Sequence, residues 1–269
     1  MARLDAYDII SIVGIPIYVV FLLCAVLLFL KHGFRNSSGW RYLVLLAVIR
    51  IVGFSMRLAI VNDPANVSLW IGWMVVNGLG LGPLVVMLLG VLNLVFDALG
   101  RQGRAVLTPT QQRLLRLLGL ASVAVTAAGG SQSSFSIQGA AVHVDYSAAS
   151  RAGAGLMIAI VVLLCLEALA ALWNRRLLAP GEYRILLGVV ASLPFVVVRL
   201  VYTCLSVFAG DNANVWTYLG MGILTEMIVV FVTAVSGLAL DRTPPSQSKS
   251  DDPELLARRR AEQQSARPC

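Results

Sequence analysis

Charged residues are scarce in this sequence. Of its 269 residues, 13% are Asp, Glu, Lys or Arg and 58% are hydrophobic, whereas ordinary soluble domains are about 25% charged. The apolar residues gather in runs of about 20, the length of helix that crosses ~30 Å of hydrocarbon. These runs lack the alternation of apolar and polar residues that marks a transmembrane barrel. The sequence therefore predicts an all-α, polytopic membrane protein, and its net charge of +7 does not indicate a nucleic-acid partner.

The side chains that hold cofactors inside membrane helices are also rare. The two lysines, Lys31 and Lys249, fall outside the apolar runs, which excludes a retinal Schiff base. The two histidines, His32 and His143, fall outside them too, which argues against a haem or metal site within the membrane. Three of the four cysteines lie in apolar runs, as small buried residues do, so they do not indicate a disulfide framework. No phosphate-binding loop or dinucleotide fingerprint is present, and we expect neither a cofactor nor a bound metal.

Seven apolar runs predict a bundle of seven transmembrane helices. Their approximate bounds are residues 9–30, 41–61, 69–96, 114–129, 152–173, 185–208 and 216–240. We assign residues 1–240 to one seven-helix domain, and residues 241–269, which are rich in Pro, Ser, Gln and charge, to a disordered cytosolic tail. In the third run Gly78 and Gly82 have the spacing that lets two membrane helices approach closely, and Pro83 is placed to open the backbone.

The basic residues predict how these helices are oriented. With seven spans, one side carries the tail and three basic loops, whose residues are Lys31, Arg35, Arg41, Arg101, Arg104, Arg113, Arg116, Arg175, Arg176 and Arg184. The other side carries only Arg3 and Arg151. The positive-inside rule then places the N-terminus outside or in a lumen and the tail in the cytosol, in the plasma membrane or an endomembrane. All five tryptophans fall at predicted helix ends, as an aromatic belt requires.

Two features lie on the predicted outer side. Asn66 begins an Asn-Val-Ser sequon, so we expect it to be a glycosylation site. The loop of residues 130–150 is polar and rich in serine, and its end, residues 140–146, fits either a short strand or the start of a helix.

Five ionisable residues lie inside the predicted spans, namely Arg50, Arg57, Glu167, Arg199 and Glu226. Counting 1.5 Å per residue from the ends of each predicted helix places Arg199 and Glu226 at the same depth in the membrane, so we predict that they form an ion pair. Arg50 and Glu167 share another depth and form the second predicted pair. Arg57 lies near the outer end of its helix, from which its head can reach the interface. Such pairs can simply lock a bundle together, but charges inside a membrane also mark functional sites.

Polar residues recur on one face of three predicted helices. In the helix of residues 69–96 this face carries Asn77, and in the helix of residues 185–208 it carries Arg199 with Tyr202 beside it. In the helix of residues 216–240, Glu226 lies at the edge of the polar face. Ser and Thr on such faces often bond only to their own backbone, yet three faces in one chain favour a polar pocket in the outer half of the bundle. We therefore take Arg50, Arg199, Tyr202, Glu226 and Asn77 as candidate ligand-binding residues.

Two stretches carry a resemblance to a known group of proteins. The first runs from Lys31-His32-Gly33-Phe34 through Ser37-Ser38-Gly39-Trp40 to Arg50-Ile51-Val52-Gly53, and the second is residues 194–202, PFVVVRLVY. In both, the chain resembles uncharacterised seven-helix integral membrane proteins of filamentous fungi. The resemblance implies seven spans and, for some members, a place in secondary-metabolite gene clusters. More loosely, the chain is similar to the fungal lipid-translocating exporters, which also have seven helices.

Three functions remain open from the sequence. The first, which we favour, is a non-enzymatic membrane protein that binds or translocates a lipid-like or amphipathic small molecule. The second is an intramembrane enzyme acting on an isoprenoid or other apolar substrate, like the acid-initiated terpenoid cyclases, with Glu226 or Glu167 as catalytic proton donor. The third is a seven-helix receptor or scaffold that uses the basic loops and tail.

Overall fold

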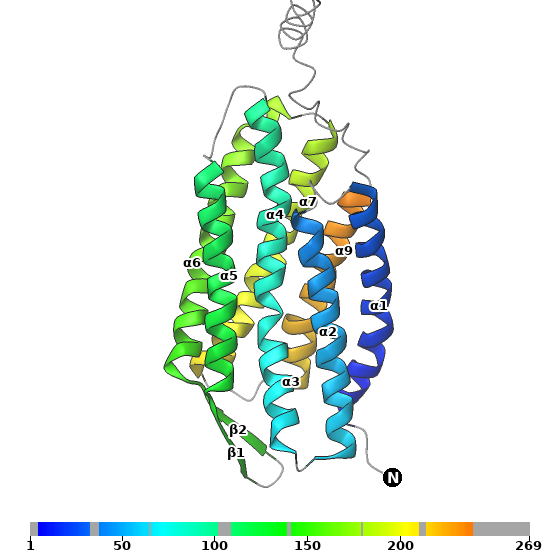
Figure 1. Ribbon diagram of the computed structural model, residues 1–269, viewed down its shortest axis with the longest axis vertical. Coiled ribbons are helices and arrows are strands. Elements are labelled where there is room, and N and C mark those ends of the chain that lie inside the picture. The colour runs from blue at the N-terminus through cyan, green and yellow to red at the C-terminus, as the bar shows by residue number, and fades with distance from the viewer. Residues whose placement is uncertain are drawn as a thin grey trace, which may run out of the picture.

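The computed structural model describes residues 5–32, 38–64, 66–101, 109–138, 141–178, 180–209 and 214–238. Within these residues, seven helices are long and apolar enough to cross a membrane, which confirms the number predicted and supports a multi-pass membrane protein. They stand side by side in one bundle (Figure 1). The tail of residues 241–269 lies outside the described residues.

The helices alternate in direction along the bundle. The elements in the chain order are α1 (Ala6–His32), α2 (Ser38–Asn62), α3 (Val67–Leu79), α4 (Leu81–Arg101), α5 (Pro109–Ser131), α6 (Ala148–Trp173), α7 (Pro180–Cys204), α8 (Val215–Thr217) and α9 (Thr225–Leu238). The short helical segments η1 (Arg175–Leu177), η2 (Leu205–Ala209) and η3 (Tyr218–Leu224) extend or join them, and η2 and η3 are π-helical. Three of the seven spans are therefore composite: α3 continues into α4, α7 continues into η2, and α8 and η3 lead into α9.

A small antiparallel hairpin connects α5 to α6. Its strands are β1 (Ser134–Gln138) and β2 (Ala141–Asp145), which pair Ser134 with Asp145 and Gln138 with Ala141. The strand alternative for the end of this loop is therefore confirmed. The hairpin lies at the same end of the bundle as the start of α1 (Figure 1), and we call this the hairpin end.

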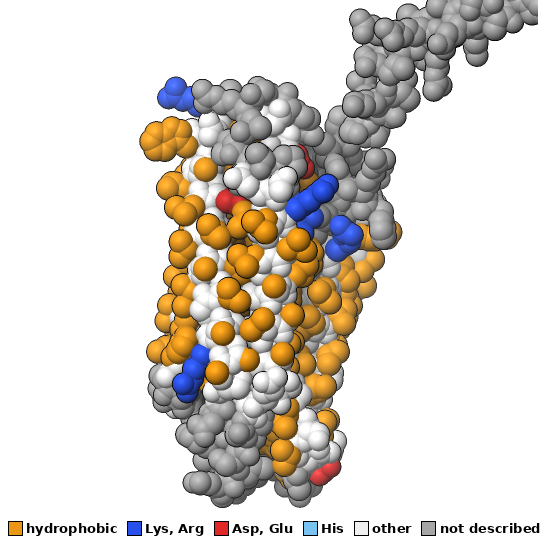
Figure 2. Space-filling view, turned by 60° about the vertical axis from the view of Figure 1, so that its left-hand side comes forward, with side chains coloured by type: hydrophobic (Ala, Val, Ile, Leu, Met, Phe, Trp, Pro, Cys, Tyr) orange, Lys and Arg blue, Asp and Glu red, His pale blue; other side chains and the backbone are white. Residues whose placement is uncertain are grey.

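The composite helix α3–α4 is the centre of the bundle. Within the span Val67–Gly100 the most apolar stretch is 89% buried, against 22% for the first span, and α4 packs against α2, α5, α6, α7 and α9. A helix that is apolar on all sides belongs in the interior. The surrounding helices expose their apolar side chains along the length of the bundle, and Lys and Arg lie toward its ends (Figure 2), as a membrane-spanning surface requires.

Only one of the two glycines predicted to permit close packing does so. A Cβ at Gly82 would overlap the side chain of Val123 on α5, whereas a Cβ at Gly78 would meet nothing within 4 Å. The predicted tryptophan belt is also only partly right. Trp173 and Trp216 are exposed at helix ends, but Trp40 and Trp73 are buried in the bundle, because their helices begin against neighbouring helices and not against lipid.

The end of α5 and the start of α6 lie in close backbone contact. A Cβ at Gly129 would lie 2.7 Å from backbone atoms of Ala149 and Ser150, and backbone cannot move aside as a side chain can. We expect Gly129→Ala to lower the free energy of unfolding by about 1–3 kcal/mol, the usual cost of overpacking. Thermal unfolding in detergent measures this. Gly155→Ala on α6 is the matched control, because its added Cβ would meet nothing within 4 Å; equal melting temperatures for the two variants would contradict the prediction.

Candidate functional site

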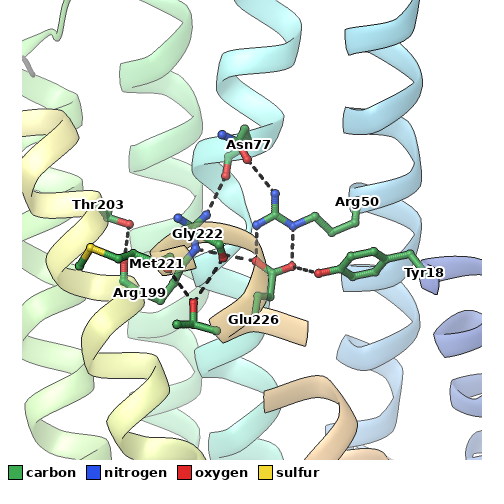
Figure 3. Close-up of polar contacts among 9 residues, drawn as sticks. Tyr18, Arg50, Asn77, Arg199, Thr203, Met221, Gly222 and Glu226 are labelled. Carbon is green, nitrogen blue, oxygen red and sulfur yellow. Dashed lines mark hydrogen bonds and ion pairs between the residues drawn. The ribbon is translucent and has the colours of Figure 1, made fainter. Parts of the chain in front are cut away.

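The centre of the site is the carboxylate of Glu226, which is completely buried. Arg50 on α2 binds it through two nitrogens, Nε to Oε1 and Nη2 to Oε2 (Figure 3). The hydroxyl of Tyr18 on α1 donates to Oε1 at 2.9 Å. Paired, charge-assisted hydrogen bonds of this kind are the strongest that side chains make, and they connect α1, α2 and α9 in the interior.

Arg199 on α7 approaches the same carboxylate from the other side. Its Nε lies 3.8 Å from Oε2 of Glu226, and its Nη2 donates to the backbone carbonyl of Asn77 at 3.2 Å. The pair predicted from equal depth is therefore confirmed, although Arg50 is the closer partner of Glu226. Arg199 is 1% exposed, and its guanidinium lies 5.0 Å from the centre of the Tyr202 ring. Within the described residues, neither Nε nor Nη1 has a hydrogen-bond acceptor.

Asn77 joins the two arginines at the point where α3 ends. Its side-chain oxygen accepts from Nη1 of Arg50 at 2.8 Å, while its backbone carbonyl accepts from Arg199 (Figure 3). The chain turns from α3 into α4 at Gly80, and a Cβ there would lie 2.9 Å from Oε2 of Glu226 and would overlap the guanidinium of Arg50. The glycine is thus what allows the central helix to touch the ion pair. We call Tyr18, Arg50, Asn77, Arg199 and Glu226 the charge network.

The second predicted pair, between Arg50 and Glu167, is wrong. Arg50 is taken by Glu226, and both carboxylate oxygens of Glu167 are buried without a hydrogen-bond partner among the residues that the structure describes. The reason is lateral position: α4 contacts both α2 and α6 and lies between them (Figure 1). Equal depth cannot bring two side chains together across a central helix.

Arg57 does not extend to the interface as predicted but is buried, with 6% of its surface exposed. Its Nε donates to Oδ1 of Asp8 at 2.9 Å. Its guanidinium lies 5.1 to 5.3 Å from the ring centres of Tyr7, Trp70 and Trp73. Ion pairing and cation–π contacts together offset the cost of burial, so the side chain is held inside the hairpin end of the bundle.

Aromatic side chains fill the space between this cluster and the charge network. The ring of Tyr218 lies 5.4 Å from that of Tyr7 and 6.4 Å from that of Trp73. Tyr146, which follows β2, is close enough to Tyr202 that burial and then this second phenol raise the pKa of Tyr146. The part of the bundle between the charge network and the hairpin end is therefore rich in tyrosine and tryptophan, groups that combine an apolar ring with a polar edge.

The hydroxyls on the predicted polar faces are bound to their own helices. Each donates to a backbone carbonyl four residues earlier, as seen for Ser192, Thr203, Ser206, Thr225, Thr233 and Ser236. They therefore add no free polar groups to a pocket, as hydroxyls in membrane helices often do not. Among the residues of the charge network, within the part of the chain that the structure describes, it is the guanidinium of Arg199 that has buried donors without an acceptor.

Two members of the site could not be chosen from the sequence. Tyr18 lies in an otherwise apolar first helix, and a single phenol there carries no pattern that sets it apart. Gly80 stands in the run Gly78-x-Gly80-x-Gly82, which marked the region but not the glycine in contact with Arg50. Neither residue carries a signal in the sequence that separates it from similar residues nearby.

Comparison with known proteins gives a family for this arrangement. Residues 4–243 match the family described as "Domain of unknown function (DUF7702)". The chain belongs to this family. The match spans all seven helices and includes every residue of the charge network, which confirms the expected membership of an uncharacterised domain family. No curated protein matches the chain.

The description of the DUF7702 family names no reaction or ligand, so the function of the site must be inferred from its geometry. Both oxygens of Glu226 are engaged by Arg50, Tyr18 and Arg199, so neither is directed at a substrate as a proton donor would be. Within the described residues, no group of three or more His, Cys, Asp or Glu side chains could hold a metal ion. The arrangement is suited to holding a polar group by hydrogen bonds and charge.

Proposed function

We propose that this protein binds, or translocates, a lipid-like or amphipathic small molecule whose polar end reaches Arg199. The observation that carries the proposal is the guanidinium of Arg199, which is 1% exposed and has two nitrogens without an acceptor among the described residues. A buried donor without a partner costs about 1–3 kcal/mol, and more when it is charged. A ligand that supplies the missing acceptors recovers this free energy on binding.

The lipid-facing side of α7 offers an apolar molecule a separate place to bind, on the other side of this helix from Arg199. A shallow groove of about 320 Å³ is lined by Leu200, Val201, Cys204, Leu205 and Phe208. Its lining residues run along the exposed face of α7 into the π-helical segment η2, on the other side of the helix from the buried Arg199, and π-helical turns occur frequently at functional sites. An alkyl or isoprenoid chain fits the chemistry of this groove, because every lining side chain is apolar.

The remaining parts of the proposal come from the sequence. We place the hairpin end outside or in a lumen and the tail in the cytosol, on the positive-inside rule. Asn66, exposed at the start of α3, is the expected glycosylation site. A fungal secondary-metabolite pathway is the setting that the resemblance implies.

We expect Arg199→Leu to remain folded but to lose its ligand. The substitution removes the charge that lacks a full set of partners and keeps the pair of Arg50 with Glu226. Mass spectrometry of small molecules extracted from purified protein should show a species retained by the wild type and reduced about tenfold or more in the variant, equivalent to about 1.4 kcal/mol.

Arg151→Leu is the matched control for this measurement. Arg151 is exposed near the start of α6 and lies outside the charge network, so its replacement should leave the retained species unchanged. Equal retention by the Arg199→Leu variant and the wild type would remove Arg199 from the proposed site.

A further inference from the structure

The charge network contains more positive than negative charge. It holds the guanidinium groups of Arg50 and Arg199 against the single carboxylate of Glu226. In the described part of the chain, the guanidinium of Arg199 also lies 5.0 Å from the ring centre of Tyr202, and a tyrosine ring supplies no formal counter-charge. Arginine stays protonated in proteins, so one positive charge remains without a counter-charge in the interior of the bundle.

Neighbouring carboxylates do not cancel this charge. Asp8 is buried, but it is paired with Arg57 at the hairpin end. The side chain of Asp5, 3.8 Å from the same arginine, is 78% exposed, and an exposed carboxylate is solvated and screened by salt. Glu167 lies on α6, behind the central helix, and makes no ion pair with either arginine of the network among the described residues.

Gly222 on η3 faces the unpartnered guanidinium. A Cβ at Gly222 on η3 would lie 3.6 Å from Nη1 of Arg199, 3.5 Å from Tyr218 and 3.7 Å from Tyr202. These are ordinary contact distances, so a methyl group attached at Gly222 would fit beside this guanidinium nitrogen and the two aromatic rings without displacing them. Nη1 is also the nitrogen of Arg199 that has neither an acceptor nor a nearby carboxylate among the described residues.

We propose that the polar end of the ligand is a singly charged oxyanion, the carboxylate of an apolar acid, with one oxygen beside Gly222 and bound to Nη1 of Arg199. This inference rests on the proposed function and names the ligand chemistry of the same site. One carboxylate neutralises the one uncompensated charge, and its bond to a guanidinium is charge-assisted. A phosphate monoester carries a charge of about −1.5 to −2 near neutral pH and would leave the network negative.

The test compares an acid with the alcohol of the same chain. Purified full-length protein in an uncharged detergent is titrated with a radiolabelled long-chain fatty acid, at a pH where the acid is ionised, and with the matching fatty alcohol. We expect saturable binding of the acid that is about tenfold or more tighter than that of the alcohol. Gly222→Ala should weaken acid binding about tenfold, because its methyl group would stand 3.6 Å from Nη1 of Arg199 and obstruct an acceptor that approaches from this side, while making only ordinary contacts with the protein.

Gly220→Ala is the matched control, since it changes another glycine of η3 and its Cβ would meet nothing within 4 Å. It should bind the acid as the wild type does, and Arg199→Gln should bind acid and alcohol equally weakly. If the alcohol binds as tightly as the acid, the oxyanion proposal is wrong while binding of an amphipathic molecule stands. If neither binds to the wild type, or if chloride alone displaces the acid, the proposed function fails as well.

Discussion

Glu226→Gln is expected to destabilise the bundle by about 3–5 kcal/mol, the usual cost of leaving a buried charge without its partner. Glu226 is the carboxylate that both Arg50 and Arg199 contact. A glutamine keeps the shape and one acceptor oxygen but leaves both guanidinium groups uncompensated, and its amide nitrogen faces one of them as a second donor. The variant should unfold at a lower temperature and yield less monodisperse protein in detergent.

Glu167→Gln is the matched control for this prediction. It makes the same chemical change at another buried glutamate, whose oxygens have no hydrogen-bond partner among the described residues. Its melting temperature should stay close to that of the wild type. Equal losses of stability in the two variants would show that burial, and not the ion pairs of Glu226, sets the cost.

Arg199→Leu separates the two arginines of the network. Because it removes the uncompensated charge and leaves Arg50 paired with Glu226, its stability should equal or exceed that of the wild type. Replacing a buried ionic group by an apolar one is often neutral or stabilising. A large difference in stability between the Glu226→Gln and Arg199→Leu variants is therefore expected if the charge network holds one excess positive charge, on which the proposed ligand depends.

Gly80→Ala should be the second most damaging change. Its Cβ would overlap the guanidinium of Arg50 and lie 2.9 Å from Oε2 of Glu226, so the central helix or the ion pair must move. Overpacking costs about 1–3 kcal/mol, and displacing a buried pair adds to it. We expect a loss of about 3 kcal/mol or more, measured as the shift of the unfolding midpoint in mixed micelles.

Gly78→Ala, two residues earlier, distinguishes sterics from backbone effects. Its Cβ would meet nothing within 4 Å, and alanine favours a helix over glycine by about 0.5–1 kcal/mol. This variant should be as stable as the wild type or slightly more so. If both alanine variants lost stability equally, the cause would be backbone flexibility at this point in the chain and not contact with the ion pair.

The sequence determined the class of protein because the membrane imposes a local rule. Every span must contain about 20 apolar residues and satisfy its own backbone hydrogen bonds, and both requirements can be checked in a continuous stretch of sequence. The weakly apolar fourth run could be included for the same reason, and the structure makes it the helix α5, Pro109–Ser131. A charge in such a stretch also stands out against its apolar neighbours, so Arg50, Arg199 and Glu226 could be chosen from the sequence alone.

The partners of those charges depend on the lateral arrangement of the helices, which the sequence does not specify. Depth along a helix follows from residue counting, and it correctly paired Arg199 with Glu226. It could not show that α4 separates Arg50 from Glu167, or that Asp8 lies beside Arg57. Only the tertiary structure placed Tyr18 and Gly80 at the carboxylate and left two nitrogens of Arg199 without an acceptor among the described residues, because side chains from five helices meet there and their packing is decided jointly.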